Sequence, residues 1–341
     1  MLKPKTLARY DQPVPRYTSY PTAPHFTEAV DAATHTRWLA EIPGGDSLSL
    51  YVHIPFCDTM CWFCGCHTRI VNRYEPIAAY LDHMTAEVER VAGTLGKRHR
   101  ASHVHWGGGT PTSLAPADIL RLSDALRTHF DFDEESEFAV ESDPRGVGEE
   151  TIAALGQAGV TRVSLGVQDF SPRVQQAVNR IQPFDETKRV IDSLRSVGIA
   201  EINIDLMYGL PHQGTDELLA TAEKVLELEP TRLALFGYAH VPWMKVHQRM
   251  IDEDALPGTE ARWQQAGAAR AFLEEHGFTT IGLDHFARDD DPMAVALKAG
   301  VLHRNFQGYT TDRANTLIGF GASSISSLPA GYVQNFPQLN L

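Results

Sequence analysis

Short strand-like runs alternate with helix-like stretches from Ser47 onward, and this alternation most strongly limits the fold. The runs are rich in β-branched and aromatic residues and cover residues 47–54, 103–106, 137–142, 161–167, 201–208, 231–238 and 279–286. Stretches of helical period lie between them, near residues 75–96, 116–129, 149–158, 172–180, 185–197, 214–228 and 259–276. Strands that alternate with helices form right-handed βαβ crossovers, which align the strands in parallel. The sequence therefore predicts an α/β fold with a partial parallel (β/α) barrel of the TIM-like type.

Three segments are expected along the 341 residues, a length that suits one barrel domain. Residues 1–46 are rich in proline and aromatic side chains, with one helical pattern near 28–41, and predict an extended N-terminal arm. Residues 47–286 form the predicted barrel. Residues 287–341 hold one helical pattern at 292–300 and are otherwise loop-rich, so we expect an extension that lines the active-site mouth.

The charge and hydropathy patterns exclude several classes of partner. The formal net charge is −13, whereas binding to nucleic acid draws most of its affinity from clustered lysine and arginine. The first twenty residues contain no apolar signal region, and no later run approaches the roughly 18 apolar residues of a membrane span. We expect a soluble, cytoplasmic monomer that binds neither nucleic acid nor a membrane.

All four cysteines lie within ten residues, at Cys57, Cys61, Cys64 and Cys66. A disulfide framework is not expected, because bridges stabilise small secreted domains and every loop closed here would be short. Clustered thiols in a large chain indicate a metal centre instead. The spacing C-x3-C-x2-C lets one loop bind three irons of a 4Fe-4S cube through Cys57, Cys61 and Cys64. The fourth iron then has no protein ligand.

Cys66 is expected not to bind iron, because it follows Cys64 too closely to reach the opposite corner of the cube. The alternative is a zinc site, since four thiols can fill a tetrahedron, although structural zinc usually takes two separated pairs. An open iron can chelate the amino and carboxylate groups of S-adenosylmethionine, which brings the sulfonium close to the cluster. Phe63, between the second and third thiols, is expected to lie against the nucleotide.

Further polar residues follow the strand-like runs, at the ends where a parallel barrel opens. The segment 107–111, GGGTP, lets a ligand approach the backbone closely, although a plain tight turn would also explain it. Glu141, Gln168, Arg180 and Asp205 lie at or near successive strand ends. They supply the anion, cation and hydroxyl partners that an amino acid with a ribose needs. The alternative is a ring of residues that hydrogen-bond one another.

The motifs together resemble one known family, the oxygen-independent coproporphyrinogen III oxidases of the radical S-adenosylmethionine (radical SAM) superfamily. The resemblance rests on YVHIPFCDTMCWFCGCH, GGGTPT, VESDPR, SLGVQDF, NIDLMYGLP and HRNFQGYTT. It runs from the PRYTSYP segment of the arm to the last residues. It is most specific at Cys64-Gly65-Cys66, and it implies a barrel of the radical SAM type.

The resemblance also implies roles for particular residues. Cys57, Cys61 and Cys64 are implied as cluster ligands, and Cys66 as a further, non-ligating cysteine of the catalytic loop. Glu141 would bind the amino group of S-adenosylmethionine and Arg180 its carboxylate. The other implied contacts are Tyr51, Phe63, Gly65, Gly108, Gly109 and Thr110 around the cofactor, Gln168 and Asp205 at the ribose, Ala239 at the adenine, and Ile325 at a second S-adenosylmethionine.

The implied activity is that of an oxidoreductase of haem biosynthesis, a coproporphyrinogen dehydrogenase. Two propionates of coproporphyrinogen III become vinyl groups without oxygen, giving protoporphyrinogen IX. A 5′-deoxyadenosyl radical takes hydrogen from the β-carbon of a propionate, which then loses carbon dioxide and one electron. The one-electron donor and acceptor are unidentified. Candidate cationic partners for the propionates are Arg16, Lys245, His247, Arg249, Arg304 and Arg313.

Four histidines near the rim are expected to be hydrogen-bonded structural imidazoles and not metal ligands. They are His53, His67, His105 and His285.

Two other functions remain as alternatives. Related haem chaperones keep the three cluster cysteines but usually lack the fourth cysteine and the HRNFQGYTT stretch. A haem-degrading radical SAM methyltransferase would release S-adenosylhomocysteine. Members of the oxidase family continue as a mostly helical C-terminal domain that covers the barrel mouth, whereas this chain ends at QNFPQLNL. We expect that domain to be absent, so the chain is either a fragment or works with an open mouth.

Overall fold

A parallel sheet forms the centre of the computed structural model, which describes residue 6, residues 9 and 10, and residues 22–339. In this described part, seven strands pair in parallel in the order β14-β1-β4-β6-β7-β8-β9. Their bounds are β1 Leu48–Ile54, β4 His99–Gly108, β6 Glu137–Ser142, β7 Arg162–Gln168, β8 Glu201–Tyr208, β9 Arg232–Gly237 and β14 Thr316–Phe320. The sheet stays open, so the predicted α/β fold with a partial parallel barrel is confirmed.

Shorter strands flank this parallel centre. At one end are β10 (Phe278–Ile281) and β11 (His285–Arg288), and at the other β15 (Ile325–Leu328) and β16 (Gly331–Gln334), all paired antiparallel. β5 (Phe130–Asp131) lies beside β4. Two small separate sheets pair β2 (Phe56–Cys57) with β3 (Arg69–Ile70), and β12 (His303–Arg304) with β13 (Tyr309–Thr310).

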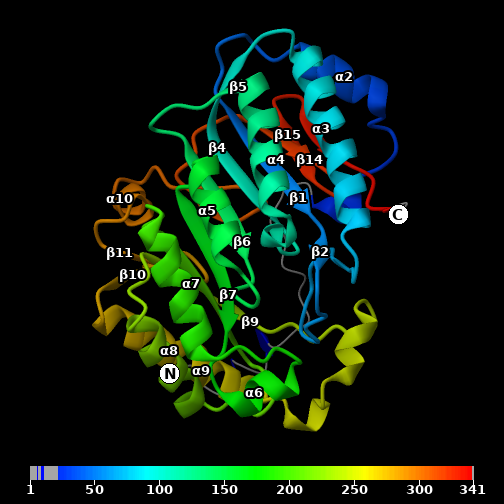
Figure 1. Ribbon diagram of the computed structural model, residues 1–341. Helices are drawn as coiled ribbons and strands as arrows, with labels where there is room; N and C mark the ends of the chain where they lie inside the picture. Colours follow the sequence, from blue (N-terminus) through cyan, green and yellow to red (C-terminus); the bar gives the residue numbers. More distant parts are fainter. Residues whose placement is uncertain (1–5, 7–8, 11–21, 340–341) are drawn as a thin grey trace.

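Helices form between the parallel strands where apolar residues recur at the helical period. Thus α3 (Glu75–Leu95) buries Ile77, Leu81, Met84 and Val88, and it ends at Gly96 with a φ of +66°. The α-helices that follow α3 in the described part are α4 Pro116–His129, α5 Glu149–Ala158, α6 Pro172–Ala177, α7 Phe184–Ser196, α8 Thr215–Leu226, α9 Thr259–Glu275 and α10 Pro292–Lys298. Helices α3, α4, α5 and α7 cover one face of the sheet in Figure 1. Each predicted helix is confirmed within a few residues.

The inner face of the sheet is polar, in contrast to its helix-covered face. In β6, Phe138 and Val140 belong to the main apolar core, whereas Glu137, Ala139 and Glu141 line a cavity. Successive side chains of a strand point to opposite faces, so each strand divides in this way. A buried parallel sheet is usually apolar on both faces. The polar inner face therefore marks the interior as the place to look for a functional site.

The expectation of one strand over residues 279–286 is wrong. β10 and β11 form an antiparallel hairpin there, and Gly282 in the turn has a φ of +60°. The seventh parallel strand is instead β14, which lies beside β1 and comes from the segment expected to be loop-rich. Its residues, TLIGF, are buried on both faces, so the run has no alternation that would identify it as a strand. The main sheet thus continues past residue 286 to β16.

The described end of the N-terminal arm contains a 3-10 helix, Ala23–His25, and one longer α-helix. α2 (Ala32–Ala40) begins after Asp31, whose carboxylate accepts a hydrogen bond from the amide of Thr34 over 2.8 Å. Arg16 and most of the proline-rich segment before Thr22 lie outside the described residues. None of the helices in the described part has the length and apolarity of a membrane span.

Candidate functional site

The loop with the four cysteines, residues 57–66, follows β2 at the carboxyl end of β1 and is held on two sides. On one side, the amide of Trp62 donates to the carbonyl of Val178 over 3.0 Å, and the Asn179 side chain donates to the carbonyl of Met60 over 2.8 Å. On the other side, Lys245 and the 3-10 helix that follows it, Val246–Met250, supply further donors. There Lys245, His247 and Gln248 donate to three carbonyls of the loop, over 2.9, 2.7 and 3.1 Å.

The thiols lie in different surroundings. The hydroxyl of Thr110 lies 3.5 Å from the Sγ atom of Cys57, and burial raises the pKa of Cys57 to about 11. The Sγ atom of buried Cys61 accepts hydrogen bonds from two guanidinium groups. A hydrogen bond between Cys64 and Cys66 lowers the pKa of Cys64 and raises that of Cys66. A thiol as buried as Cys57 becomes a thiolate at neutral pH when a cation such as iron binds it.

The thiols of the cysteine loop do not converge on one point. Among the described residues, no three histidine, cysteine, aspartate or glutamate side chains are gathered closely enough to hold one metal ion. A 4Fe-4S cube spreads its thiolate ligands over separate corners and so does not need them at one point. Three thiols on one loop, beside a small cavity, fit such a cluster.

The glycine segment at the end of β4 brings backbone atoms close to the cysteine loop. A Cβ atom on Gly109 would lie 2.5 Å from the carbonyl oxygen of Phe56, and one on Gly107 would lie 2.8 Å from the carboxylate of Glu141. The amide of Gly109 donates to the carbonyl of Ile54 over 2.8 Å. Only glycine permits this close packing, so the segment is more than a plain turn.

Glu141 is the last but one residue of β6 and points toward the glycine segment. Its carboxylate accepts hydrogen bonds from Nε2 of His105 and from the amide of Gly108, both over 3.1 Å. Burial acts to raise the pKa of Glu141, but these hydrogen bonds and the charges of nearby imidazoles lower it below its usual value. About two fifths of the side chain, 41%, is exposed to the cavity. Glu141 is therefore an anion that faces the cavity.

Arg180 follows α6 and reaches the cysteine loop from the other side. Its Nη1 atom lies 3.3 Å from Cys61 Sγ and 2.9 Å from Asp143 Oδ2, and its Nη2 atom donates to the carbonyl of Gly166. The Nε atom is buried without a hydrogen-bond partner. Because buried donors are normally satisfied, this atom fits a bound carboxylate.

Gln168 and Asp205 lie on neighbouring strands at the same end of the sheet. Gln168 has a φ of +70°, at an irregularity in the pairing of β7 with β8. Such a φ is strained for a residue other than glycine and often occurs at functional sites. Burial, together with the charge of Glu141, raises the pKa of Asp205 to about 6. The Asp205 carboxylate accepts hydrogen bonds from Asn203 and Ser164 over 2.8 and 3.3 Å.

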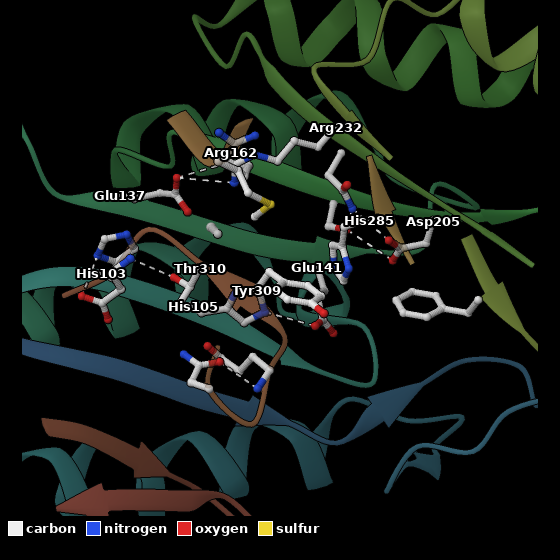
Figure 2. A pocket seen from close by; sticks show the side chains of 18 of the residues that line it. His103, His105, Glu137, Glu141, Arg162, Asp205, Arg232, His285, Tyr309 and Thr310 are labelled. Atoms are coloured by element: carbon white, nitrogen blue, oxygen red, sulfur yellow. Dashed lines mark hydrogen bonds and ion pairs between the residues drawn. The ribbon is translucent and has the colours of Figure 1, made fainter. Parts of the chain in front are cut away.

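Two adjacent cavities occupy this end of the sheet. The smaller, of about 160 Å³, lies among the cysteine loop, the glycine segment and Arg180. The larger, of about 390 Å³, extends along the polar inner face to Arg232. Figure 2 shows polar side chains of several strands pointing into the larger cavity, with His105 beside Glu141. The two cavities share seven wall residues, which are Phe63, Cys64, Cys66, Glu141, Ser164, Gln168 and Asp205.

Most of the predicted site residues come together around the smaller cavity. Its walls include Cys57, Cys61, Phe63, Cys64, Cys66, Gly108, Gly109, Thr110, Glu141, Gln168, Arg180 and Asp205. Gly65 lines the larger cavity, and Tyr51 lies beside it, with its ring 5.9 Å from that of His105. Ala239 follows β9, and Ile325 is in β15; neither residue lines either cavity.

Several residues that the structure places at the site were not among those predicted from the sequence. Asp143 and Arg145 lie beside Cys61. Their motif, VESDPR, contributed to the family resemblance, but no role was predicted for either residue. Ser164 and Asn203 hold Asp205. Alternate residues of a strand face the same side, so the two-residue spacing of Ser164 and Asn203 from other inward-facing residues of β7 and β8 could have identified them.

The expectation that the four histidines are hydrogen-bonded agrees with their contacts. His53 lies between the hydroxyl of Tyr51 and the carbonyl of His67, whose own ring contacts the carbonyl of Pro337. His105 pairs with Glu141, and His285 pairs with Asp284. All four rings therefore have hydrogen-bonding partners.

The candidate cations for propionates that lie in the described part of the chain, Lys245, His247, Arg249, Arg304 and Arg313, do not line either cavity. Lys245 and His247 instead donate to the cysteine loop, and Arg304 lies over the ring of Tyr309 at 5.4 Å. Arg249 and Arg313 are exposed. The arginines that do line the larger cavity, Arg162 and Arg232, are buried in ion pairs.

A partial parallel barrel with a three-cysteine loop after its first strand is the arrangement of the radical SAM superfamily, and the model of that superfamily matches residues 51–225. A curated relative from Bradyrhizobium diazoefficiens, named oxygen-independent coproporphyrinogen III oxidase, is 54% identical over 329 residues, 96% of this chain and 73% of the relative. A relative of the same name from Escherichia coli K12 is 42% identical over 98% of this chain and 72% of the relative.

A solved structure, of the coproporphyrinogen III oxidase from Escherichia coli, described as a radical SAM enzyme, aligns with a TM-score of 0.92 at 41% identity. The alignment covers 98% of this chain and 75% of that structure. The chain belongs to the oxygen-independent coproporphyrinogen III oxidases of the radical SAM superfamily. This membership confirms the prediction of a 4Fe-4S cluster and S-adenosylmethionine as cofactors, and it does not favour the haem chaperone or the methyltransferase.

Proposed function

We propose that this chain is an oxidoreductase of haem biosynthesis that converts two propionates of coproporphyrinogen III to vinyl groups without oxygen, giving protoporphyrinogen IX. The two relatives are named for this activity, and their sequences align with nearly the whole of this chain. One structural observation supports it above all: a small cavity at the cysteine loop shares seven wall residues with a larger cavity. A cofactor in the first would lie directly beside a substrate group that enters the second.

The cluster and S-adenosylmethionine, when bound, supply the one-electron chemistry that produces a 5′-deoxyadenosyl radical. Cys57, Cys61 and Cys64 are the proposed iron ligands. Cys66 is proposed not to bind iron, and its hydrogen bond to Cys64 supports this, because a cube spreads its thiolate ligands over separate corners. The protein's own contribution is to position the reactants and to exclude water from them.

The cofactor-binding roles follow from charge and position. Glu141, held as an anion, is proposed to bind the amino group of S-adenosylmethionine. Arg180 is proposed to bind the carboxylate, because its Nε atom has no other partner. Gln168 and Asp205, at the shared wall, are proposed for the ribose. The remaining proposed cofactor contacts are Tyr51, Phe63, Gly65, Gly108, Gly109 and Thr110.

Two further contacts rest on the family resemblance. Ala239 is proposed at the adenine, and its position just after β9 puts it at the same end of the sheet as Asp205. Ile325 is proposed at a second S-adenosylmethionine. It neighbours Gly319, which pairs with Tyr51 of β1.

The electron-transfer partners, the cellular location, the oligomeric state and the functional division of the chain are also proposals. The reaction takes one electron from a donor and, after loss of carbon dioxide, gives one to an acceptor; neither has been identified. A cytoplasmic monomer without nucleic acid or membrane contacts is proposed, in keeping with the net charge of −13. The division into an arm (1–46), a barrel (47–286) and a mouth-lining extension (287–341) is proposed as a functional one. Gln307, Tyr309 and Thr310 of the extension line the larger cavity.

The test is an anaerobic assay of the reconstituted protein. Iron and sulfide are added, dithionite reduces the protein, and S-adenosylmethionine and coproporphyrinogen III are supplied. The expected result is 5′-deoxyadenosine together with mono-vinyl and di-vinyl products. Nucleotide cleavage without vinyl product would point to another substrate, and bound haem without cleavage would point to the chaperone.

A further inference from the structure

Arg145 makes a contact with the cysteine loop that the proposed cofactor contacts do not include. Its Nη2 atom donates to the Sγ atom of Cys61 over 3.3 Å. Cys61 itself is only 7% exposed. Arg145 lines neither cavity, so it reaches the sulfur from outside the space proposed for S-adenosylmethionine.

Asp143 fixes the position of this guanidinium group. Its carboxylate accepts from Nε of Arg145 over 3.0 Å and from Nη2 over 2.6 Å, and it also accepts from the amide of Arg145 over 3.0 Å. The same carboxylate accepts from Nη1 of Arg180 over 2.9 Å. The Asp143 carboxylate therefore joins two guanidinium groups, and each of them also touches Cys61 Sγ.

The three side chains together bring a net charge of +1 to one thiol. The carboxylate of Asp143 stays ionised, because the two arginines outweigh the effect of burial and lower its pKa. Hydrogen bonds and positive charge at a ligand sulfur stabilise the added electron of a reduced iron-sulfur cluster more than they stabilise the oxidised state. Among the hydrogen bonds of the described residues, Cys61 is the predicted iron ligand whose sulfur accepts from guanidinium groups.

We infer that Arg145 is a positioning residue for the cluster: it holds a positive charge and an N–H donor at Cys61 Sγ and thereby raises the cluster's reduction potential. This inference rests on the proposed function, since it assumes that Cys61 binds a 4Fe-4S cluster. One electron converts the cluster from the 2+ to the 1+ state, and no bond breaks in that step. Arg180 shares the contact, but its proposed task is the cofactor carboxylate. The task of Arg145 is at the sulfur alone.

The test is a redox titration of the reconstituted full chain in the absence of substrate and S-adenosylmethionine. Dithionite and mediators set the potential, and electron paramagnetic resonance measures the reduced cluster. For Arg145→Gln we expect the ratio of reduced to oxidised cluster, at the wild-type midpoint, to fall about tenfold, which is a shift of 59 mV for one electron. Iron content should remain as in the wild type, and so should the effect on the signal when S-adenosylmethionine is added to a separate reduced sample.

Arg189→Gln is the matched control. Arg189 donates to the carbonyl of Val147, two residues beyond Arg145, over 3.1 Å, so its loss removes the same charge without touching the sulfur. Its midpoint should equal that of the wild type. An unchanged midpoint in a fully loaded Arg145→Gln variant, or an equal shift in the control, would overturn the inference.

Arg145→Lys decides the question if Arg145→Gln does not retain the cluster. A lysine keeps the charge, but its single ammonium group cannot form the two-point contact with the Asp143 carboxylate and also donate to the sulfur. Its midpoint should therefore lie below that of the wild type, and a wild-type midpoint would contradict the inference. Because no substrate is present, failure here is distinct from failure of the proposed reaction, which the vinyl products report.

Discussion

The Nε2 atom of His105 lies 3.1 Å from Oε1 of Glu141, across the pairing of β4 with β6. A carboxylate can only accept, so this nitrogen carries the proton. Glu141→Gln removes the charge that we propose binds the amino group of S-adenosylmethionine. The loss of a charge-assisted hydrogen bond should weaken cofactor binding by about 10- to 100-fold. Anaerobic equilibrium dialysis with the labelled cofactor measures the change.

The control for this variant is Glu149→Gln, which changes an exposed glutamate in the first turn of α5. Its affinity should match the wild type. If Glu141→Gln also binds the cofactor as tightly as the wild type does, another residue must bind the amino group.

The four cysteines should separate into two classes when each is replaced by alanine. Cys57→Ala, Cys61→Ala and Cys64→Ala should each lose most of the iron after reconstitution, because each removes one of three ligands. Cys66→Ala should keep its iron and its visible absorption. Iron and sulfide analysis checks this. Retention of the full iron content in a variant that lacks all three predicted ligands would rule out the cluster assignment.

Strong local patterns account for what the sequence could predict. The bounds of α4, α5, β6 and β8 agree with the expected ranges, because apolar periodicity and flanking turn residues mark them clearly. The cysteine spacing likewise predicts its own loop. β14 was missed, since its pairing with β1 joins distant parts of the chain and leaves no local signal.

On the strands, a site residue was predictable where its position along the strand decided its direction. Glu141 and Asp205 face inward by strand alternation. The task of Lys245 depends instead on how the segment after β9 packs, and the structure places its Nζ atom on the carbonyl of Cys66 and not in a substrate cavity. Likewise, the motif VESDPR marks Arg145 as polar but not as a neighbour of Cys61.

Replacement of Gly109 tests the close packing of the glycine segment. In Gly109→Ala the new Cβ atom would lie 2.5 Å from the carbonyl oxygen of Phe56, so the backbone must move. Overpacking of this kind costs about 1–3 kcal/mol, and the free energy of unfolding should fall by that amount. Urea unfolding of the metal-free protein measures it.

Gly93→Ala is the control for Gly109→Ala. Gly93 lies within α3, and a Cβ there meets no atom within 4 Å. Alanine is the better helix former, so this variant should be more stable than the wild type by about 0.5–1 kcal/mol. A Gly109→Ala protein of wild-type stability would show that the loop can relax without cost.

The raised pKa of Asp205 predicts a pH-dependent difference in stability. Burial, together with the charge of Glu141, raises this pKa from 3.8 to about 6. The protonated form is thus favoured by folding, and its contribution to stability is present below pH 3.8 and is lost as the pH rises through about 6. Asp205→Asn cannot titrate. Between pH 4 and 7.5 its stability relative to the wild type should therefore increase, by up to about 3 kcal/mol.

Urea unfolding at several pH values tests this difference. Asp192→Asn, which alters an exposed ion pair with Lys188, is the control. Its difference from the wild type should stay constant within about 1 kcal/mol over the same range. A pH-independent difference for Asp205→Asn would mean that Asp205 is ionised in the folded protein throughout.

The ion pair of Arg232 with Asp291 should contribute to the stability of the sheet edge. Nε of Arg232 lies 2.9 Å from both carboxylate oxygens of Asp291, and the two side chains are only 8% and 2% exposed. Asp291 also accepts from the amide of Met293 and so begins α10. Asp291→Ala leaves the buried guanidinium group of Arg232 with only its longer pair to Glu137, at 3.9 Å, and it leaves a helix uncapped. The free energy of unfolding should fall by about 3–5 kcal/mol. Lys298→Ala breaks an exposed pair of the same helix with Asp289 and should change little; equal losses in the two variants would show that burial of the pair has no energetic consequence.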